Sequence, residues 1–202
     1  MSYQEDIWRF EARNVQEEAD QRQILAFIRR DADGVLQREH PAHITASALV
    51  FNPAKTKVLL VFHNQFRAWS WTGGHADGQA DLLAAAMREA REETGIREAE
   101  PLSPAIQSLD ILPVWGHEKQ GRYVTAHLHL SVGYALTAPE NQPLAAKTDE
   151  NSGVRWVSVR QLEQLTSIRY LRALDMPLQE IAVYMNDRDV DNVAAALRRQ
   201  KH

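Results

Sequence analysis

The feature that most constrains this chain is a stretch of helical spacing that runs from a glycine pair, Gly73-Gly74, to a single glycine, Gly95. Asp81 suits the N-cap of a helix, because its carboxylate accepts a hydrogen bond from an amide of the first turn. Gly95 suits the left-handed residue that commonly ends a helix. The pattern therefore predicts a helix that begins after Asp81, ends before Gly95 and follows a tight glycine turn.

Three carboxylates lie on one face of this predicted helix. Glu89, Glu92 and Glu93 are spaced i, i+3 and i+4, so they are neighbours on the helix surface and repel one another. A solvated charged face is the plain interpretation, but such a face has no need of a glycine turn beside it. A hard divalent cation does need converging oxygen atoms. We expect the opposite stripe to pack on a core, and it consists of Leu83, Ala86, Met87 and Ala90.

The stretch resembles the Nudix box, in which a glycine is followed at fixed spacings by Arg-Glu, Glu-Glu, a second glycine and an aliphatic residue. The matching positions are Gly74, Arg88, Glu89, Glu92, Glu93, Gly95 and Ile96. At average residue usage, a chance match of the Gly, Arg and Glu positions is on the order of 10⁻⁵ per chain. Two positions depart from the pattern. The box also has a glutamate six positions after its first glycine, where this chain has Ala80, and an aliphatic residue directly after Arg-Glu, where this chain has the small Ala90.

The resemblance implies the fold class of the family, an α/β/α sandwich with a mixed sheet. It covers about residues 43–166, which we take as the hydrolase domain. Residues 1–42 are then a helical extension at the N-terminus, and residues 167–202 a helical tail at the C-terminus.

The resemblance also implies an activity and a set of roles. The implied reaction is hydrolysis of a phosphoanhydride, in a nucleoside diphosphate linked to another moiety, by attack of water with Mg²⁺ or Mn²⁺ as cofactor. Glu89 and Glu93 are the implied metal ligands, and Glu92 binds the metal or orients the water. The Gly73 carbonyl completes the metal shell, and Arg88 holds the carboxylates by a bidentate pair. The implied catalytic residues are thus Glu92, Glu93 and Arg88.

Residues outside the box supply substrate specificity in this fold. Trp71 and Trp69 alternate as in a strand, and both stacking on a substrate and core packing remain open for them. Glu118 and Glu150 are candidates for the further acidic residue that several Nudix enzymes carry on a loop. Arg122 ends the polar loop 115–122 and is a candidate substrate contact.

The histidines give no zinc spacing. We interpret His63 and His75 as polar turn residues. His127 and His129 alternate along a predicted strand, where a shared polar cavity and an exposed sheet face are both open, and we favour the exposed face.

The rest of the chain alternates helical and strand patterns. Residues 1–32 have helical spacing. The predicted helix either completes the core or forms a lid or dimer contact over the site. The expected strands are 44–51 and 58–62, joined as a hairpin, then 109–114, 125–136 and 154–157, followed by a helix at 161–165.

Composition excludes several classes. The net charge is −4, which gives no general attraction to nucleic acid or to an anionic membrane. There are no cysteines, so disulfides and thiolate metal sites are excluded. The N-terminus has no apolar core and no run is long enough to span a membrane. A cytoplasmic enzyme acting on a small molecule is the expectation.

The tail supports a second hypothesis. Residues 170–181 are similar to the later helices of MerR-type regulators, where a Leu-Arg-x-Leu segment precedes a Leu-x-Glu-Ile helix. The DNA-reading helix-turn-helix of that family has no counterpart here, so we interpret the tail as an oligomerisation or packing element that would suit a homodimer. The alternative function is a catalytically weak Nudix module that senses a nucleotide and acts through this tail.

Overall fold

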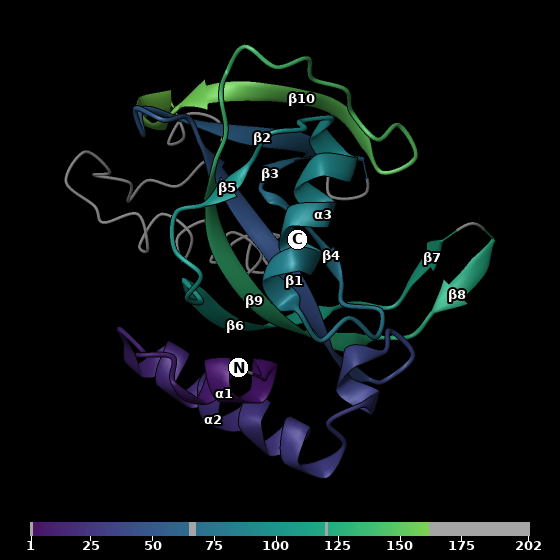
Figure 1. Cartoon of the computed structure of the whole chain (residues 1–202). Helices are drawn as coiled ribbons and strands as arrows, with labels where there is room; N and C mark the ends of the chain where they lie inside the picture. The colour runs from purple at the N-terminus through teal and green to yellow at the C-terminus, as the bar shows by residue number, and fades with distance from the viewer. Residues whose placement is uncertain (1, 65–67, 120, 162–202) are drawn as a thin grey trace, which may run out of the picture. The chain divides into compact units, whose positions relative to one another are not determined.

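The computed structural model describes residues 2–64, 68–119 and 121–161 (Figure 1). These residues form two compact units. The first unit takes the described residues up to Ala48, then Gly73–Glu89 and Ser103–Tyr134; the second takes the others. Three long elements run from one unit into the other: strand β1 (Ala42–Phe51), helix α3 (Leu82–Thr94) and strand β9 (His127–Thr137).

One large sheet contains most of the described strands, in the order β10-β2-β1-β9-β5, with β3 on β2, β4 on β1 and β6 on β9. Strands β7 and β8 pair only with each other. The remaining bounds are β2 (Lys57–His63), β3 (Ala68–Ser70), β4 (Thr72–His75), β5 (Glu100–Pro101), β6 (Ser108–Val114), β7 (His117–Lys119), β8 (Arg122–Val124) and β10 (Asn151–Ser158).

The first unit begins with two helices where the spacing predicted one. Helix α1 (Tyr3–Trp8) begins at a capping box formed by Ser2 and Glu5, and α2 (Val15–Arg30) begins at Asn14, whose side chain accepts a hydrogen bond from the Glu17 amide at 2.9 Å. The single predicted helix is therefore wrong, because Asn14 is a second N-cap. Buried Ile24 and Ile28 place α2 in the core, and α2 packs against β6.

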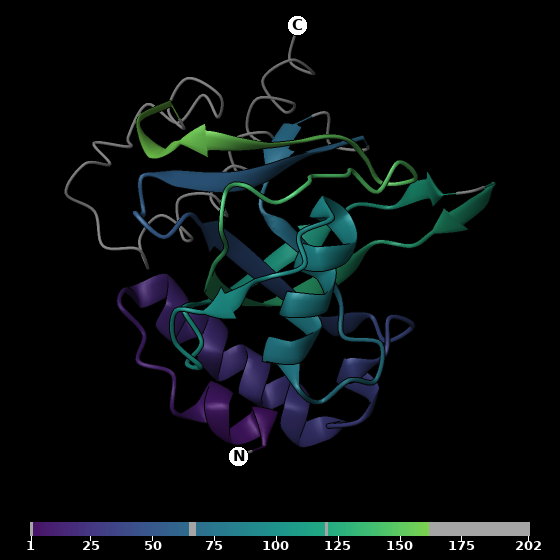
Figure 2. The same ribbon diagram turned by 45° about the horizontal axis from the view of Figure 1, so that its top comes forward.

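Strands of the first unit place several polar side chains inside. Every residue of β1 is buried, so this strand has no solvated face. Strand β6 pairs antiparallel with β9, with Leu109 opposite Val132. The first unit also contains a short 3-10 helix, η1 (Gly34–Leu36). Its β7–β8 hairpin projects outward (Figures 1 and 2). The sequence predicted this hairpin segment as a loop, and Gly121 at φ +73° makes its tight turn.

The second unit is built on strand β2. The predicted hairpin is confirmed: β1 pairs antiparallel with β2, with Val50 opposite Leu59, and Asn52 turns the chain by accepting the amides of Thr56 and Lys57. Strand β10 lies antiparallel to the other side of β2. An apolar cluster fills this unit, formed by Leu49, Phe51, Val58, Leu60, Ala135, Val157 and Val159.

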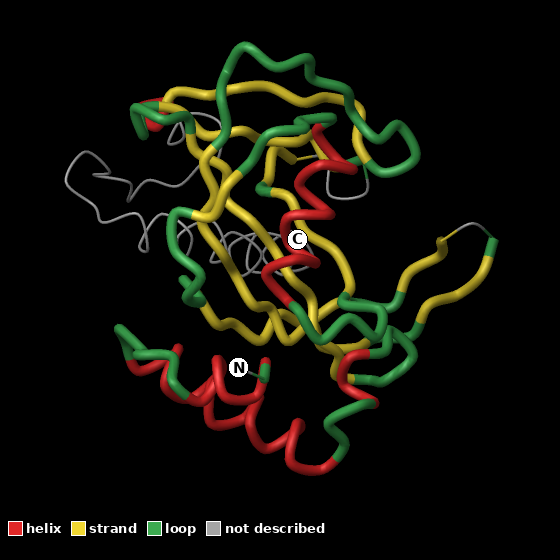
Figure 3. Tube along the Cα trace, viewed as in Figure 1, coloured by secondary structure: helices red, strands yellow, loops and turns green. Residues whose placement is uncertain are grey.

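These elements confirm the predicted α/β class with a large mixed sheet (Figure 3). A 3-10 helix, η2 (Val159–Gln161), ends the described chain. The helix predicted at 161–165 and the tail from residue 168 lie outside the described residues. Within the described ranges, none of the helices has the length and apolar character needed to cross a membrane.

Candidate metal and hydrolase site

Helix α3 carries the carboxylates, and its ends are those that the sequence predicted. Asp81 Oδ1 accepts a hydrogen bond from the Ala84 amide at 2.9 Å, and Gly95 adopts φ +77° with its amide on the Arg91 carbonyl. The rotation of the helix differs from the prediction. Glu89 and Glu93 are buried on the same side as Ala86 and Ala90, whereas Leu83 and Met87 are only half-buried. The two carboxylates therefore do not lie opposite the core-facing stripe; they lie within it.

The predicted glycine turn is wrong: Gly73 and Gly74 lie in strand β4 rather than in a turn, and Gly74 lies directly against Glu89. A Cβ at position 74 would be 2.5 Å from Cδ of Glu89 and within 2.7 Å of both carboxylate oxygens. Only glycine leaves room for the carboxylate there, since a Cβ essentially never lies under 3.0 Å from another heavy atom. Gly73 instead approaches strand β1, where a Cβ would be 2.9 Å from the Ser47 Cα. The two glycines of β4 thus allow the strand to approach β1 at Gly73 and the Glu89 carboxylate at Gly74.

Arg88 holds Glu89 from the side. Its Nη1 lies 2.7 Å from Oε1 of Glu89, and its Nη2 donates to the carbonyl oxygen of His75 at 3.4 Å. The guanidinium thus connects the helix to the residue that follows the glycine pair. That Arg88 positions a carboxylate rather than contacts substrate stays a prediction.

The other two carboxylates have different surroundings. Glu93 is buried, and Asn151 Nδ2 donates to its Oε2 at 3.3 Å. Glu92 is exposed, with Lys147 Nζ 4.0 Å from its Oε2. The same Nζ lies 2.9 Å from Glu150 Oε2, so Lys147 is an ion-pair partner of both Glu92 and Glu150.

The candidate substrate residues lie outside helix α3. Trp71 is half-buried and packs against the apolar cluster of the second unit. Glu118 and Arg122 are exposed on the β7–β8 hairpin, where Glu118 pairs across the strands with Tyr123. Trp69, in β3, has the Arg155 guanidinium 4.2 Å above its ring. Ala80 is exposed just before Asp81.

A cluster of histidines in the first unit was missed by the sequence reasoning. His43, His75 and His129 come from β1, β4 and β9, and their ring centroids are 4.9–5.2 Å apart. His127 lies 5.0 Å from His43 and from His129. The favoured exposed face for His127 and His129 is wrong, because neither side chain is exposed. No local signal reveals the cluster, since its members lie far apart in sequence on separate strands.

The histidines of this cluster are poorly placed to carry protons. Burial lowers the pKa of His129 to about 3, with the neighbouring imidazoles adding to the effect. Burial also lowers the pKa of His43, against the opposing effect of its hydrogen bond to the His40 carbonyl. Both rings are therefore neutral at neutral pH.

The carboxylate set on α3 fits a hard divalent cation. Two buried carboxylates one helical turn apart, about 5–6 Å between Cβ atoms, have lost much of their hydration and repel each other. The Arg88 guanidinium lies against Glu89, and Asn151 donates a hydrogen bond to Glu93. Oxygen donors of this kind are those that Mg²⁺ and Mn²⁺ prefer.

Comparison with known proteins places the chain in a family. The model of the NUDIX domain matches residues 41–174, more than half of the chain. No curated protein matches. Among solved structures, a C. elegans Ap4A hydrolase complex is similar at 16% identity and TM-score 0.43, over 76% of this chain and 98% of that one.

Two further structures are similar to this chain. The E. coli dihydroneopterin triphosphate pyrophosphohydrolase has 16% identity and TM-score 0.45, over 60% of this chain and 84% of its own. A NUDIX-family hydrolase from Clostridium perfringens has 20% identity and TM-score 0.43, over 73% and 95%. With the domain match covering the glycine pair of β4, helix α3 and its carboxylates, the chain belongs to the Nudix family and is a Nudix-type hydrolase.

Proposed function

We propose that this protein hydrolyses a phosphoanhydride bond in a nucleoside diphosphate linked to another moiety, with Mg²⁺ or Mn²⁺ as cofactor. The observation that carries the proposal is the pair of buried carboxylates, Glu89 and Glu93, on one face of α3, with Gly74 against the first of them. Buried negative charges are costly unless a cation compensates them, so their retention in the core supports a metal site.

Glu89 and Glu93 would hold the cation, with the Gly73 carbonyl as a further oxygen ligand. A bound divalent cation neutralises phosphate oxygens and lowers the pKa of a water molecule. Arg88 keeps Glu89 in place through the 2.7 Å contact, and Asn151 orients Glu93. These partners matter because the carboxylates must be held within a fraction of an ångström for efficient chemistry.

Glu92 is the carboxylate best suited to the reacting water, because it is exposed and α3 places it next to Glu93. In the proposed step, the water oxygen bonds to phosphorus while the bond from phosphorus to the bridging oxygen breaks. The water proton passes to Glu92 and then to solvent, and the bridging oxygen leaves with the other product. Glu150, which shares Lys147 with Glu92, is a further candidate to accept this proton.

Substrate contacts are proposed from the remaining candidates. The part of Trp71 that the apolar cluster leaves uncovered offers a surface on which a base can stack. The exposed Arg122 guanidinium suits a phosphate group, and Glu118 suits a sugar hydroxyl or a base amine.

The proposal is tested by phosphate release, with Mg²⁺ or Mn²⁺, across nucleoside triphosphates, dinucleoside polyphosphates, nucleotide sugars and dinucleotide cofactors. Glu93→Gln should lose most of the metal-dependent turnover and remain folded, because the amide keeps the shape of the side chain but not its charge. The matched control is Glu98→Gln, an exposed glutamate outside α3. Unchanged turnover in Glu93→Gln would refute the assignment, and nucleotide binding without any turnover would favour the sensor hypothesis.

A further inference from the structure

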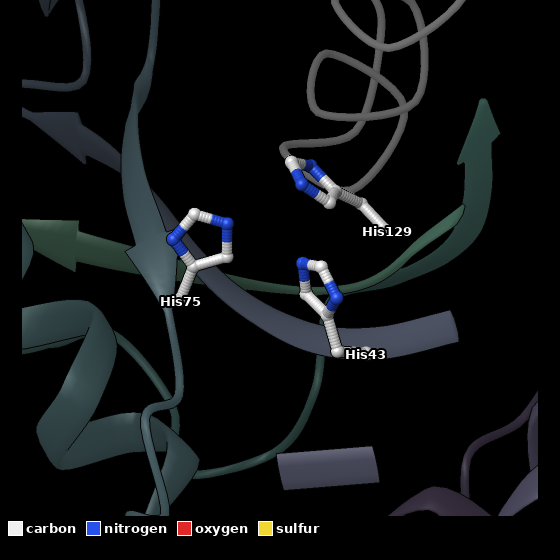
Figure 4. Close-up of side chains that lie close together, drawn as sticks. All are labelled: His43, His75 and His129. Atoms are coloured by element: carbon white, nitrogen blue, oxygen red, sulfur yellow. The ribbon is translucent and has the colours of Figure 1, made fainter. Parts of the chain in front are cut away.

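A second group of ligand-type side chains lies in the first unit, separate in chemistry from the carboxylates. His43, His75 and His129 each offer a ring nitrogen, and these three atoms lie within 4.8 Å of one another. Figure 4 shows the three rings turned toward a common space, one from each of strands β1, β4 and β9. Imidazole nitrogen is the ligand that zinc, copper, iron and nickel favour.

His43 presents a lone pair that has no partner among the residues the structure describes. Its side chain is buried, at 2% exposure, and its Nδ1 lies 2.7 Å from the His40 carbonyl oxygen. Because a carbonyl oxygen only accepts, the proton of the neutral ring is on Nδ1, and Nε2 carries the lone pair. This Nε2 has no hydrogen-bond partner among the described residues. In Figure 4 one ring nitrogen of His43 faces the space between His75 and His129.

An unpaired buried acceptor destabilises the fold when nothing compensates it. A metal ion in the common space would compensate it. The backbone hydrogen bond on the far nitrogen is also the arrangement that fixes the tautomer and the ring orientation of metal-binding histidines.

His127 adds a second oriented ring at the edge of this cluster. Its Nδ1 lies 2.8 Å from the Thr125 carbonyl oxygen, so its proton is also on Nδ1. Its Nε2 lies 3.2 Å from Nε2 of His129. His127 therefore restricts the rotation of the His129 ring, and we assign it a positioning role.

We propose that His43, His75 and His129 bind one divalent transition-metal ion of the zinc type, distinct from the cation on helix α3. If the three nitrogens stood at the corners of a triangle with 4.8 Å sides, its centre would be about 2.8 Å from each. Zinc–nitrogen bonds are about 2.0–2.1 Å. Each ring then moves inward by less than about 1 Å, which small side-chain rotations supply. Three imidazoles also leave a fourth position for water or an anion.

The proposed site would add side-chain links between strand β4 and its neighbours in the sheet. His75 directly follows Gly74, and its carbonyl accepts from Arg88. A metal bound to His75 would join strand β4 to β1 and β9 through side chains, beside the backbone pairing of β4 with β1. Loss of this ion should therefore lower the thermal stability of the protein even where no substrate is present.

The test uses the full chain, prepared without a polyhistidine tag and freed of metal with a chelator. Co²⁺ and then Zn²⁺ are titrated in the presence of excess Mg²⁺, which would occupy the carboxylates. We expect one equivalent of Co²⁺ per chain, with the visible absorption of a nitrogen-ligated, low-coordinate ion. His43→Gln and His129→Gln should each weaken Co²⁺ binding by on the order of 10²-fold or more, since even loss of an orienting partner costs about 10–100-fold.

Two controls separate this site from the proposed hydrolase site. His117→Gln, on the β7–β8 hairpin, should leave Co²⁺ binding unchanged. Glu93→Gln should lose Mg²⁺-dependent hydrolysis and keep Co²⁺ binding. A wild-type chain without saturable Co²⁺ binding, or unchanged binding in both histidine variants, would overturn the proposal.

Should the histidine variants not fold, X-ray absorption of the Zn²⁺-loaded wild type decides the matter. Three imidazole ligands per ion support the site, and fewer than three reject it.

Discussion

Replacement of Gly74 by alanine tests whether glycine is required at this position of β4 to leave room for the Glu89 carboxylate. The new Cβ would lie 2.5 Å from Cδ of Glu89, whereas ordinary van der Waals contact begins near 3.4 Å. The carboxylate must therefore recede by about 1 Å. Because the atoms in the way are the end of a flexible side chain, this movement should cost the fold little.

The same 1 Å matters far more to the proposed chemistry. Bonds from Mg²⁺ to oxygen are about 2.0–2.1 Å and tolerate little distortion, so the displaced carboxylate no longer reaches the ion. A misplacement of about 1 Å in a catalytic group costs on the order of 10²-fold in rate. We therefore expect kcat/KM to fall on the order of 10²-fold, which corresponds to about 2.7 kcal/mol of transition-state stabilisation.

Steady-state kinetics across a Mg²⁺ titration measures this loss, and thermal unfolding of the same samples measures the fold. The contrasting variant is Gly73→Ala, whose Cβ would meet the backbone of Ser47 at 2.9 Å and should lower Tm. Gly74→Ala should keep Tm close to that of the wild type. Wild-type kcat/KM and metal affinity in Gly74→Ala would refute the argument that this glycine makes room for a metal ligand.

The remaining predictions concern the metal shell and the surface. Ala80→Glu restores the first glutamate of the box and should tighten Mg²⁺, and an unchanged metal titration rejects this. Asn151→Ala removes the donor to Glu93 and should lower kcat about 10-fold or more; a wild-type kcat argues against an orienting role. The hydrogen bond from Lys57 lowers the pKa of exposed Glu140 below its ordinary 4.5. The stability that this hydrogen bond gives the folded protein is therefore fully present above pH 4.5, and it is lost as the pH falls through the lower pKa of the folded state. The Tm difference between the wild type and Glu140→Gln should therefore shrink below pH 4.5, and a constant difference contradicts this.

Local sequence signals predicted the elements well where a single residue determines where a helix or strand begins or ends. Asp81 and Gly95 give the bounds of α3, and Asn52 gives the turn between β1 and β2. Asn14 is a signal of the same kind, and its N-cap explains why the first helical stretch is two helices.

The rotation of α3 was not predictable from hydropathy. Alanine contributes little to a hydrophobic face, and glutamate is normally assigned to solvent. The helical spacing therefore predicted that Glu89 and Glu93 lie on the face of α3 away from the core. The structure buries both, which the proposed cation would explain. The histidine cluster was not predictable for another reason: its members meet only because β4 pairs with β1 and β9 lies beside β1. Strand order depends on the whole chain and has no local signature.

Strand β4 also has a consequence for how this protein can vary in length. Successive residues of a strand face opposite sides, so Gly73 and His75 share one side and Gly74 takes the other. The insertion of a single residue would exchange these sides, turning the histidine toward Glu89 and the carboxylate-facing glycine away from it. Related chains that keep both proposed sites should therefore show no insertions or deletions between Thr72 and His75, while the β7–β8 hairpin is free to lengthen.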